Sequence, residues 1–361
     1  MKPTQKLHDA GQSLWLDNIT RKLLTSGGLQ RYISDDSVTG LTSNPTIFDH
    51  AITKSSDYDT SIRQKSEAGK SGEELFFELA LEDCAAAADL FRPIHDQTNG
   101  LDGWVSIEVS PKLAYDTSST VAAARELHRR GGRPNLFIKI PGTPEGIPAI
   151  EQSIFEGIPI NVTLLFSREQ YLAAADAYIR AVERRIATGL NPCVPSVASL
   201  FVSRWDVSVN KKVPEALHNR IGIAIAKRTY KAHRELLSSD RWLRLDNFGA
   251  RAQRLLWAST GTKDPKASDV LYIGSLAAPH TVNTMPETAL TAFADHGKVG
   301  QMLSKSGGNS EKELAEFVRA GIDLDETAEQ LQREGAEAFV QSWDDLMSRI
   351  EEKTAGLRKA S

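Results

Sequence analysis

The chain has 361 residues, of which 40% are hydrophobic and 25% are charged, the composition of an ordinary globular protein. This length often means two domains, but one α/β barrel of about 250 residues with added helices also fits. The formal net charge of −4 argues against nucleic acid or an anionic membrane as the main partner. A phosphorylated substrate would therefore need a local cluster of cations.

The cysteine content and the N-terminal segment indicate the cellular compartment in which the protein is found. Two cysteines, Cys84 and Cys193, are too few for a disulfide framework or a zinc site. The first 20 residues have no apolar core of a signal peptide, and no apolar run approaches the ~18 residues of a membrane span. We therefore expect a reduced, soluble, cytoplasmic protein.

Short apolar segments alternate with longer amphipathic ones, a pattern typical of a parallel sheet. The eight candidate strands are Leu14–Leu16, Thr39–Leu41, Trp104–Glu108, Leu136–Ile140, Ile158–Val162, Val194–Ala198, Leu255–Ala258 and Val270–Ile273. Eight parallel strands close a (β/α)8 barrel, the TIM barrel. The sequence thus predicts an α/β fold with one barrel domain over 1–361, its core at about 12–300 and a helical extension at about 301–361.

Several helices carry clear signals at their ends. Ser71–Glu74 has the pattern of a capping box, and Ser167–Gln170 opens a second helix. A third helix is predicted from Thr120 to Arg130, ending at the glycine pair Gly131-Gly132. Residues 311–357 are expected to be mostly helical and to close or flank the barrel without contributing site chemistry.

Polar side chains stand near the carboxyl ends of seven of these strands, which is where barrel active sites lie. They are Asp17, Asn44, Glu108, Lys139, Asn161 with Thr163, Ser199 with Arg204, and Ser259 with Lys263. Each alone is weak evidence, because any surface carries polar residues. Their chemical types and their depth in apolar segments make the set informative.

Lys139 lies within the apolar strand Leu136-Phe-Ile-Lys-Ile140. A lysine buried in a parallel strand is rare, because its charge must be desolvated or paired. An apolar interior disfavours the protonated form, and the neutral amine is the nucleophile that attacks carbonyls. The alternative is a lysine at a strand edge whose amine extends to solvent.

Two carboxylates accompany this lysine. Glu108 ends the apolar strand Trp104–Glu108, and Asp17 ends Leu14-Trp-Leu-Asp17. A buried glutamate near a lysine can accept and return protons during imine formation, and a second acid can take a hydroxyl proton during carbon–carbon cleavage. The alternatives are a structural ion pair for Glu108, with Lys139 itself as one partner, and a helix N-cap or loop hydrogen bond for Asp17.

Other strand ends offer groups for a polar ligand. Pro45 favours an extended Asn44 whose amide can face the barrel mouth, although Asn-Pro also opens ordinary turns. Asn161 and Thr163 are two residues apart and share a strand face, where they could bind sugar hydroxyls or a catalytic water. Thr163 could also be simple strand packing.

The late strand ends supply cations and hydroxyls. Arg204 follows Ser199-Leu-Phe-Val-Ser203, and Lys263 follows Ser259-Thr-Gly-Thr262. Barrels commonly hold a phosphate in these loops, and arginine suits bidentate contact with it. A surface ion pair is the alternative for each cation.

These segments resemble a known family. Leu41-Thr-Ser-Asn-Pro-Thr-Ile47, Ser106-Ile-Glu-Val-Ser110 with Asp116, Phe137-Ile-Lys-Ile140, Asn161-Val-Thr-Leu-Leu-Phe-Ser167 and Ser199-Leu-Phe-Val-Ser-Arg204 are similar to transaldolase, in particular to its longer bacterial form. The likeness runs from about residue 10 to residue 290. It implies a class I aldolase barrel that uses no metal or organic cofactor and acts on small sugar phosphates, without a nucleic acid or membrane partner. A homodimer is one assembly that the sequence permits.

The resemblance also implies roles for single residues. Lys139 corresponds to the imine-forming nucleophile, Glu108 to an acid–base acting through water, and Thr163 to the residue that holds that water. Asp17 corresponds to the base that takes the hydroxyl proton when the C3–C4 bond breaks. Ligands of the dihydroxyacetone part correspond to Asn44, Asn161 and Ser199, and a phosphate ligand corresponds to Arg204.

One position departs from the family pattern. Shorter members have an arginine two residues after the seventh-strand serine, where this chain has Gly261, and Lys263 is the nearest cation. The implied reaction is transfer of dihydroxyacetone from sedoheptulose 7-phosphate or fructose 6-phosphate to an aldose phosphate, in the non-oxidative pentose phosphate pathway. The alternatives are a fructose-6-phosphate aldolase that releases free dihydroxyacetone, and a non-catalytic barrel. Glu108 favours transfer, because the related aldolases have tyrosine at that position.

Overall fold

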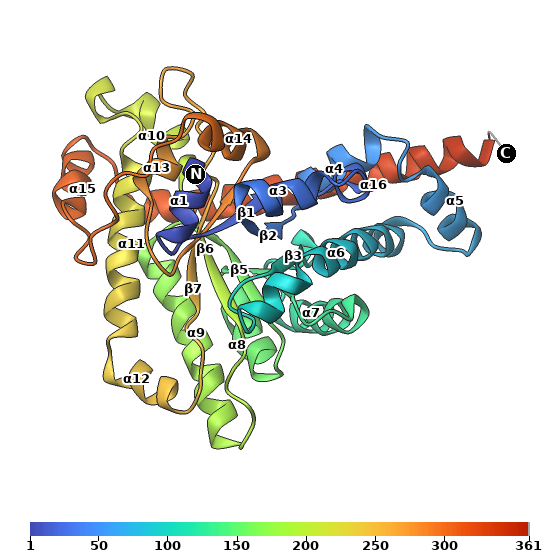
Figure 1. Cartoon of the computed structure of the whole chain (residues 1–361), viewed down its shortest axis with the longest axis horizontal. Helices are drawn as coiled ribbons and strands as arrows, with labels where there is room; N and C mark the ends of the chain where they lie inside the picture. The colour runs from blue at the N-terminus through green and yellow to red at the C-terminus, as the bar shows by residue number, and fades with distance from the viewer. Residues whose placement is uncertain (360–361) are drawn as a thin grey trace.

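Eight parallel strands close into a barrel in the order in which they occur along the chain, as the computed structural model of residues 1–359 shows (Figure 1). The strands are β1 (Ser13–Asp17), β2 (Val38–Thr42), β3 (Trp104–Glu108), β4 (Leu136–Pro141), β5 (Ile160–Leu165), β6 (Ser196–Phe201), β7 (Arg254–Ala258) and β8 (Val282–Met285). The predicted TIM-barrel fold is confirmed. The assignment of one domain stays a prediction, and residues 360–361 of the predicted extension lie outside the described residues.

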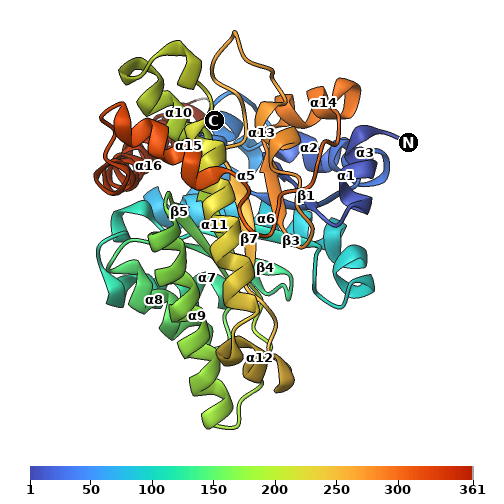
Figure 2. The same ribbon diagram turned by 90° about the vertical axis from the view of Figure 1, so that its left-hand side faces the viewer.

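Helices surround the barrel and follow its strands. They are α1 (Pro3–Asp9), α2 (Arg21–Thr25), α3 (Gly28–Asp36), α4 (Pro45–Thr53), α5 (Asp59–Glu67), α6 (Gly72–Gln97), α7 (Thr117–Gly131), α8 (Gly146–Phe155), α9 (Arg168–Ala187), α10 (Ser203–Val209), α11 (Ile221–Leu237), α12 (Asp240–Asn247), α13 (Leu271–Ser275), α14 (Glu287–His296), α15 (Ser310–Arg319) and α16 (Leu324–Lys359). Three short 3₁₀ turns are Pro111–Leu113, Asn210–Lys212 and Glu215–Leu217. Figure 2 shows α9 and α11 as neighbouring long helices on the outside of the barrel, with α15 beside α11. Within residues 1–359, no helix is long and apolar enough to span a lipid bilayer.

The eighth strand was predicted at the wrong place. Val270–Ile273 is not a strand, because Leu271–Ser275 forms helix α13, and β8 is Val282–Met285. A short apolar run does not distinguish a strand from a buried helix. The true strand carries the polar residues Asn283 and Thr284, which are 0% and 4% exposed and interrupt its apolar pattern. The predicted fifth and sixth strands also start two residues too early.

The three signalled helices are present, but α7 begins three residues before the predicted Thr120, and one of the predicted caps does not form. The Ser167 side chain accepts the Gln170 amide at 3.1 Å, and Gly132 ends α7 with a left-handed φ of 56°. Ser71 precedes α6 but makes no side-chain cap bond. Gly72 follows with φ of 50°, so the first turn departs from the geometry that a capping box needs.

Alternation along the strands divides the barrel interior into layers. Trp15, Trp104 and Phe137 share strand faces with Asp17, Glu108 and Lys139 but lie nearer the amino ends of the strands. The rings of Trp104 and Phe137 stack with centroids 4.1 Å apart. These aromatic side chains form an apolar floor, and the polar residues lie above it.

The C-terminal helix α16 runs from the barrel along α4 to the edge of the molecule (Figure 1). Polar contacts fix it there: Arg349 pairs with Asp49 at 2.6 Å, and Lys353 pairs with Asp59 at 2.7 Å. The prediction that residues 311–357 are mostly helical is confirmed by α15 and α16, and these contacts hold α16 against the early part of the chain.

Candidate active site

A cavity of about 140 Å³ opens at the carboxyl ends of the barrel strands. Its lining includes nine of the ten predicted site residues: Asp17, Asn44, Lys139, Asn161, Thr163, Ser199, Arg204, Ser259 and Lys263. The tenth, Glu108, lies beside Lys139, because β3 and β4 pair in register at these two residues. The residues predicted at the strand ends therefore lie together in one site.

Lys139 is 6% exposed, so its amine does not extend to solvent. Its Nζ donates to the carbonyl oxygen of Ser43 at 2.9 Å and lies 3.1 Å from Oε2 of Glu108. A buried ammonium is tolerated only when it is paired in this way. The Glu108 carboxyl is thus close enough to accept a proton from the amine or to return one.

Glu108 is also buried, at 7% exposed. Burial raises the pKa of its carboxyl above the ordinary value, while the charge of Lys139 acts in the opposite direction. A carboxyl with a raised pKa exchanges its proton closer to neutrality than an exposed glutamate does. The ion pair between Glu108 and Lys139 that the sequence left open is present, and it is compatible with proton transfer between them.

Asp17 does not cap a helix, since the N-cap of α2 is Thr20. Its Oδ1 accepts the hydroxyl of Thr42 at 2.7 Å, and Thr42 lies 2.6 Å from the hydroxyl of Thr284. Burial raises the pKa of Asp17, and Lys139 and Lys263 oppose that shift. The carboxyl is therefore fixed in orientation by two threonines from β2 and β8.

Two hydrogen bonds fix the side-chain amide of Asn161 in the cavity. Asn161 accepts the Ser199 hydroxyl at 2.7 Å and donates to Ser106 at 3.1 Å. The neighbouring Thr163 is 0% exposed, and its Oγ1 has no hydrogen-bond partner among residues 1–359. A buried hydroxyl without a protein partner is suited to binding a water molecule or a ligand hydroxyl.

Asn44 has the extended backbone that Pro45 predicted, with φ of −156°. Its Oδ1 caps α4 by accepting the Ile47 amide at 3.0 Å. The Asn-Pro pair therefore opens a helix, and the side-chain oxygen is already used there. The amide nitrogen is the group that Asn44 has left for a ligand.

The cations at the late strand ends make no ion pair with the described residues. Arg204 lies between aromatic rings, with Cζ 5.3 Å from the centre of Phe201 and 5.7 Å from that of Phe339. Lys263 is exposed at the rim, and Ser259 contacts the Ser203 hydroxyl at 2.8 Å. The surface-pair alternative for Arg204 and Lys263 is therefore not observed.

Comparison with known proteins identifies the family of the chain. A family model described as "Transaldolase/Fructose-6-phosphate aldolase" matches residues 14–350. A transaldolase of Arthrobacter sp. (strain FB24) is 43% identical, with 99% of each chain covered. A transaldolase of Saccharopolyspora erythraea is 44% identical with 97% covered, and one of Thermobifida fusca is 43% identical with 98% covered.

The chain belongs to the transaldolase/fructose-6-phosphate aldolase family. Within residues 1–359, no group of three or more histidine, cysteine, aspartate or glutamate side chains is arranged to hold a metal ion.

The prediction that the C-terminal helices contribute nothing to the site was wrong. Phe339 of α16 lines the cavity and packs against Arg204. Gln332 of the same helix donates its Nε2 to the carbonyl oxygens of Gly142 and Leu164, both at 2.9 Å. Gly142 and Leu164 follow directly on Pro141 of β4 and Thr163 of β5, so α16 holds two strand ends of the site.

Further lining residues escaped the sequence analysis, namely Thr42, Phe201, Thr284, Pro286 and Phe339. Thr42 and Phe201 lie two residues from Asn44 and Ser199, within the same strand-end segments, so their positions could have indicated that they line the site. Thr284 was missed because β8 was misplaced. No local pattern marks Phe339, which reaches the site only through the docking of α16.

Proposed function

We propose that the chain is a transaldolase that transfers a dihydroxyacetone unit through an imine on Lys139. The donors are sedoheptulose 7-phosphate or fructose 6-phosphate, and the acceptors are glyceraldehyde 3-phosphate or erythrose 4-phosphate. The observation that carries the proposal is the buried contact of 3.1 Å between Lys139 and Glu108 beside a polar cavity. The names of the relatives, all transaldolases, favour transfer over simple cleavage.

Imine formation is the first step. The neutral amine of Lys139 attacks the C2 carbonyl carbon of the donor, and the new C–N bond gives a carbinolamine. Glu108, which accepts the ammonium proton of Lys139, returns it to the carbinolamine hydroxyl through a water bound by Thr163. That hydroxyl leaves as water, and the nitrogen lone pair forms the iminium bond. The raised pKa of Glu108 matches this exchange.

Cleavage is the second step. Asp17 accepts the proton of the C4 hydroxyl, C4 becomes an aldehyde carbon, and the C3–C4 bond breaks. The electron pair of that bond passes through C2 to the iminium nitrogen and leaves an enamine on Lys139. Asn44, Asn161 and Ser199 hold the hydroxyl groups of the remaining three-carbon unit. Addition of the enamine to an acceptor aldehyde reverses these steps.

The phosphate group of either sugar lies at the late strand ends. Arg204 provides the principal charge, because it is partly buried and forms no ion pair with a carboxylate among residues 1–359. Ser259 and Lys263 complete the contact. The Nζ of Lys263 lies 4.0 Å from where a Cβ of residue 261 would be, so the lysine occupies the space near the glycine that departs from the family pattern.

Product analysis with and without an acceptor tests this function. Fructose 6-phosphate and erythrose 4-phosphate together should give sedoheptulose 7-phosphate and glyceraldehyde 3-phosphate at many turnovers per site. Fructose 6-phosphate alone should release at most about one equivalent of glyceraldehyde 3-phosphate per site and little free dihydroxyacetone, because the three-carbon unit stays bound to Lys139. Fast release without acceptor would instead indicate a lyase. A cytoplasmic role in the non-oxidative pentose phosphate pathway follows from this proposal, and a homodimer stays a prediction.

A further inference from the structure

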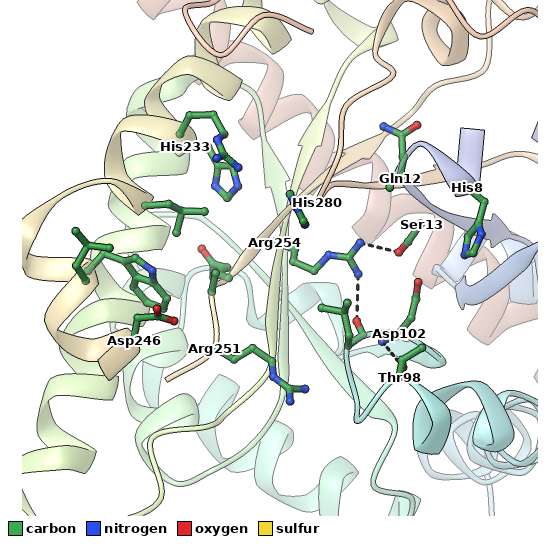
Figure 3. A pocket seen from close by; sticks show the side chains of 18 residues that line it. His8, Gln12, Ser13, Thr98, Asp102, His233, Asp246, Arg251, Arg254 and His280 are labelled. Carbon is green, nitrogen blue, oxygen red and sulfur yellow. Dashed lines mark hydrogen bonds between the residues drawn. The ribbon is translucent and has the colours of Figure 1, made fainter. Parts of the chain in front are cut away.

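A second and larger cavity, of about 570 Å³, lies at the opposite end of the barrel (Figure 3). Its walls come from segments that enter the amino ends of β1, β3, β7 and β8, and from the end of α11 and from α12. Figure 3 shows Arg254 in the middle, with His8 and Gln12 on one side and His233 and Asp246 on the other. The chemistry proposed above uses none of these residues. The volume is in the range of sites for small organic ligands.

Three arginines line this cavity, and none forms an ion pair with a carboxylate among residues 1–359. Arg254 donates to the Ser13 hydroxyl at 2.6 Å, to the Thr281 carbonyl oxygen at 2.9 Å and to the Leu101 carbonyl oxygen at 3.1 Å. These neutral acceptors fix the guanidinium in place but leave its charge uncompensated by an ion pair.

The other two arginines are still less engaged. Arg251 donates to the carbonyl oxygen of Asn99 at 2.7 Å. Arg234 has a buried Nε without a hydrogen-bond partner in the described chain. Both lie in the lining of the same cavity as Arg254. Their free N–H groups are donors that an anionic ligand could use.

The carboxylates of the cavity do not neutralise these cations. Asp102 accepts the indole N–H of Trp15 and the hydroxyl of Thr39, both at 2.8 Å, and it acts on Arg254 only from beyond ion-pair distance. Asp246 is exposed and forms no ion pair with residues 1–359. The lining therefore contains three guanidinium groups and two carboxylates, and an excess of positive charge remains.

One wall of the cavity is apolar. Leu237 of α11 and Trp242 and Leu243 of α12 contribute it, and Leu243 is 45% exposed. A site that combines an apolar wall with unpaired guanidinium groups is complementary to an amphipathic anion. It would bury the apolar part against α12 and direct the anionic group toward the arginines.

We propose that this cavity binds a small organic phosphate with an aromatic portion, of the size of a mononucleotide. The phosphate contacts Arg251 and Arg254, which both donate to carbonyl oxygens of residues 99–101. Arg234 adds its charge from α11, and the ring packs against the apolar wall around Trp242. The site is separate from the cavity that contains Lys139, so its occupancy does not depend on the transferase proposal.

Calorimetric titration of the full chain with ADP at low ionic strength tests the proposal. We expect saturable binding, at least tenfold weaker binding of adenosine, which lacks the phosphates, and weaker binding of inorganic phosphate, which lacks the ring. The double variant Arg234→Gln/Arg251→Gln should bind ADP at least tenfold more weakly. Arg244→Gln is the matched control, because this exposed arginine of α12 lies outside the cavity lining.

Two further measurements keep the outcome decisive. ADP should bind Arg204→Gln as it binds the unaltered chain, and an azido-ADP should label residues 233–254 of the unaltered chain, which requires no variant. Absence of saturable ADP binding up to millimolar concentration would overturn the proposal. So would loss of binding in Arg204→Gln, or labelling confined to the cavity around Lys139.

Discussion

Replacing Gln332 with leucine removes the side chain through which α16 holds the ends of β4 and β5. Two hydrogen bonds of 2.9 Å are lost, and both acceptors are backbone carbonyls in a buried region. At about 1–1.5 kcal/mol for each bond, the free energy of unfolding should fall by about 2–3 kcal/mol. Leu164, one of the two acceptors, has a left-handed φ of 59°, a strained geometry that the surrounding contacts must maintain.

The same substitution should also lower the catalytic rate, because Leu164 is next to Thr163. Relaxation of this segment would displace the Thr163 hydroxyl, so we expect kcat to fall about tenfold to a hundredfold, with a small change in KM for the donor. Urea unfolding and steady-state kinetics measure both effects. Gln341→Leu is the matched control, since the side chain of this exposed glutamine of α16 bonds only Asp345 among the described residues. A Gln332→Leu variant with unaltered stability and kcat would refute the reasoning.

Three further substitutions probe the site. Arg204→Gln should raise KM for fructose 6-phosphate about 10–100-fold with little effect on non-phosphorylated fructose, and an equal effect on both sugars would contradict phosphate binding. Lys263→Met should raise the same KM only about 2–5-fold, because its exposed charge is screened by solvent; a larger rise than that of Arg204→Gln would reverse the assignment. Asp17→Asn should abolish donor cleavage without loss of stability at pH 7, measured by urea unfolding. Burial raises the pKa of the Asp17 carboxyl, so protonation of Asp17 stabilises the fold at low pH. This contribution is lost as the pH rises through the raised pKa, so removing the carboxylate should cost no stability at pH 7. Marked destabilisation at pH 7 would show that the Asp17 carboxylate has a structural role.

The strand ends were predictable because a parallel barrel gathers them at one rim. A polar residue within an apolar strand, such as Lys139 in β4, is conspicuous in a sequence, and in a parallel barrel the carboxyl ends of all eight strands lie at the same face. Locating such residues requires only the local sequence of each strand and no knowledge of contacts between distant residues. Asp17, Asn161 and Ser199 were therefore placed correctly, even though two strand boundaries were shifted by two residues.

The remaining features depend on tertiary contacts that leave no local pattern. β8 was missed because its buried polar residues bond to other strands and break the apolar run, as Thr284 does with Thr42. Gln332 and Phe339 look like ordinary positions of an amphipathic helix. Their roles follow from the docking of α16 over the barrel, more than 130 residues along the chain from the residues they contact.

The proposed reaction depends on an imine between Lys139 and the donor sugar. Incubation with fructose 6-phosphate and borohydride, followed by peptide mass spectrometry, tests it most directly. We predict one reduced dihydroxyacetone adduct per chain on Lys139, irreversible loss of activity, and no adduct in Lys139→Met. Full activity after this treatment with Lys139 unmodified, or an adduct on another lysine, would contradict the mechanism.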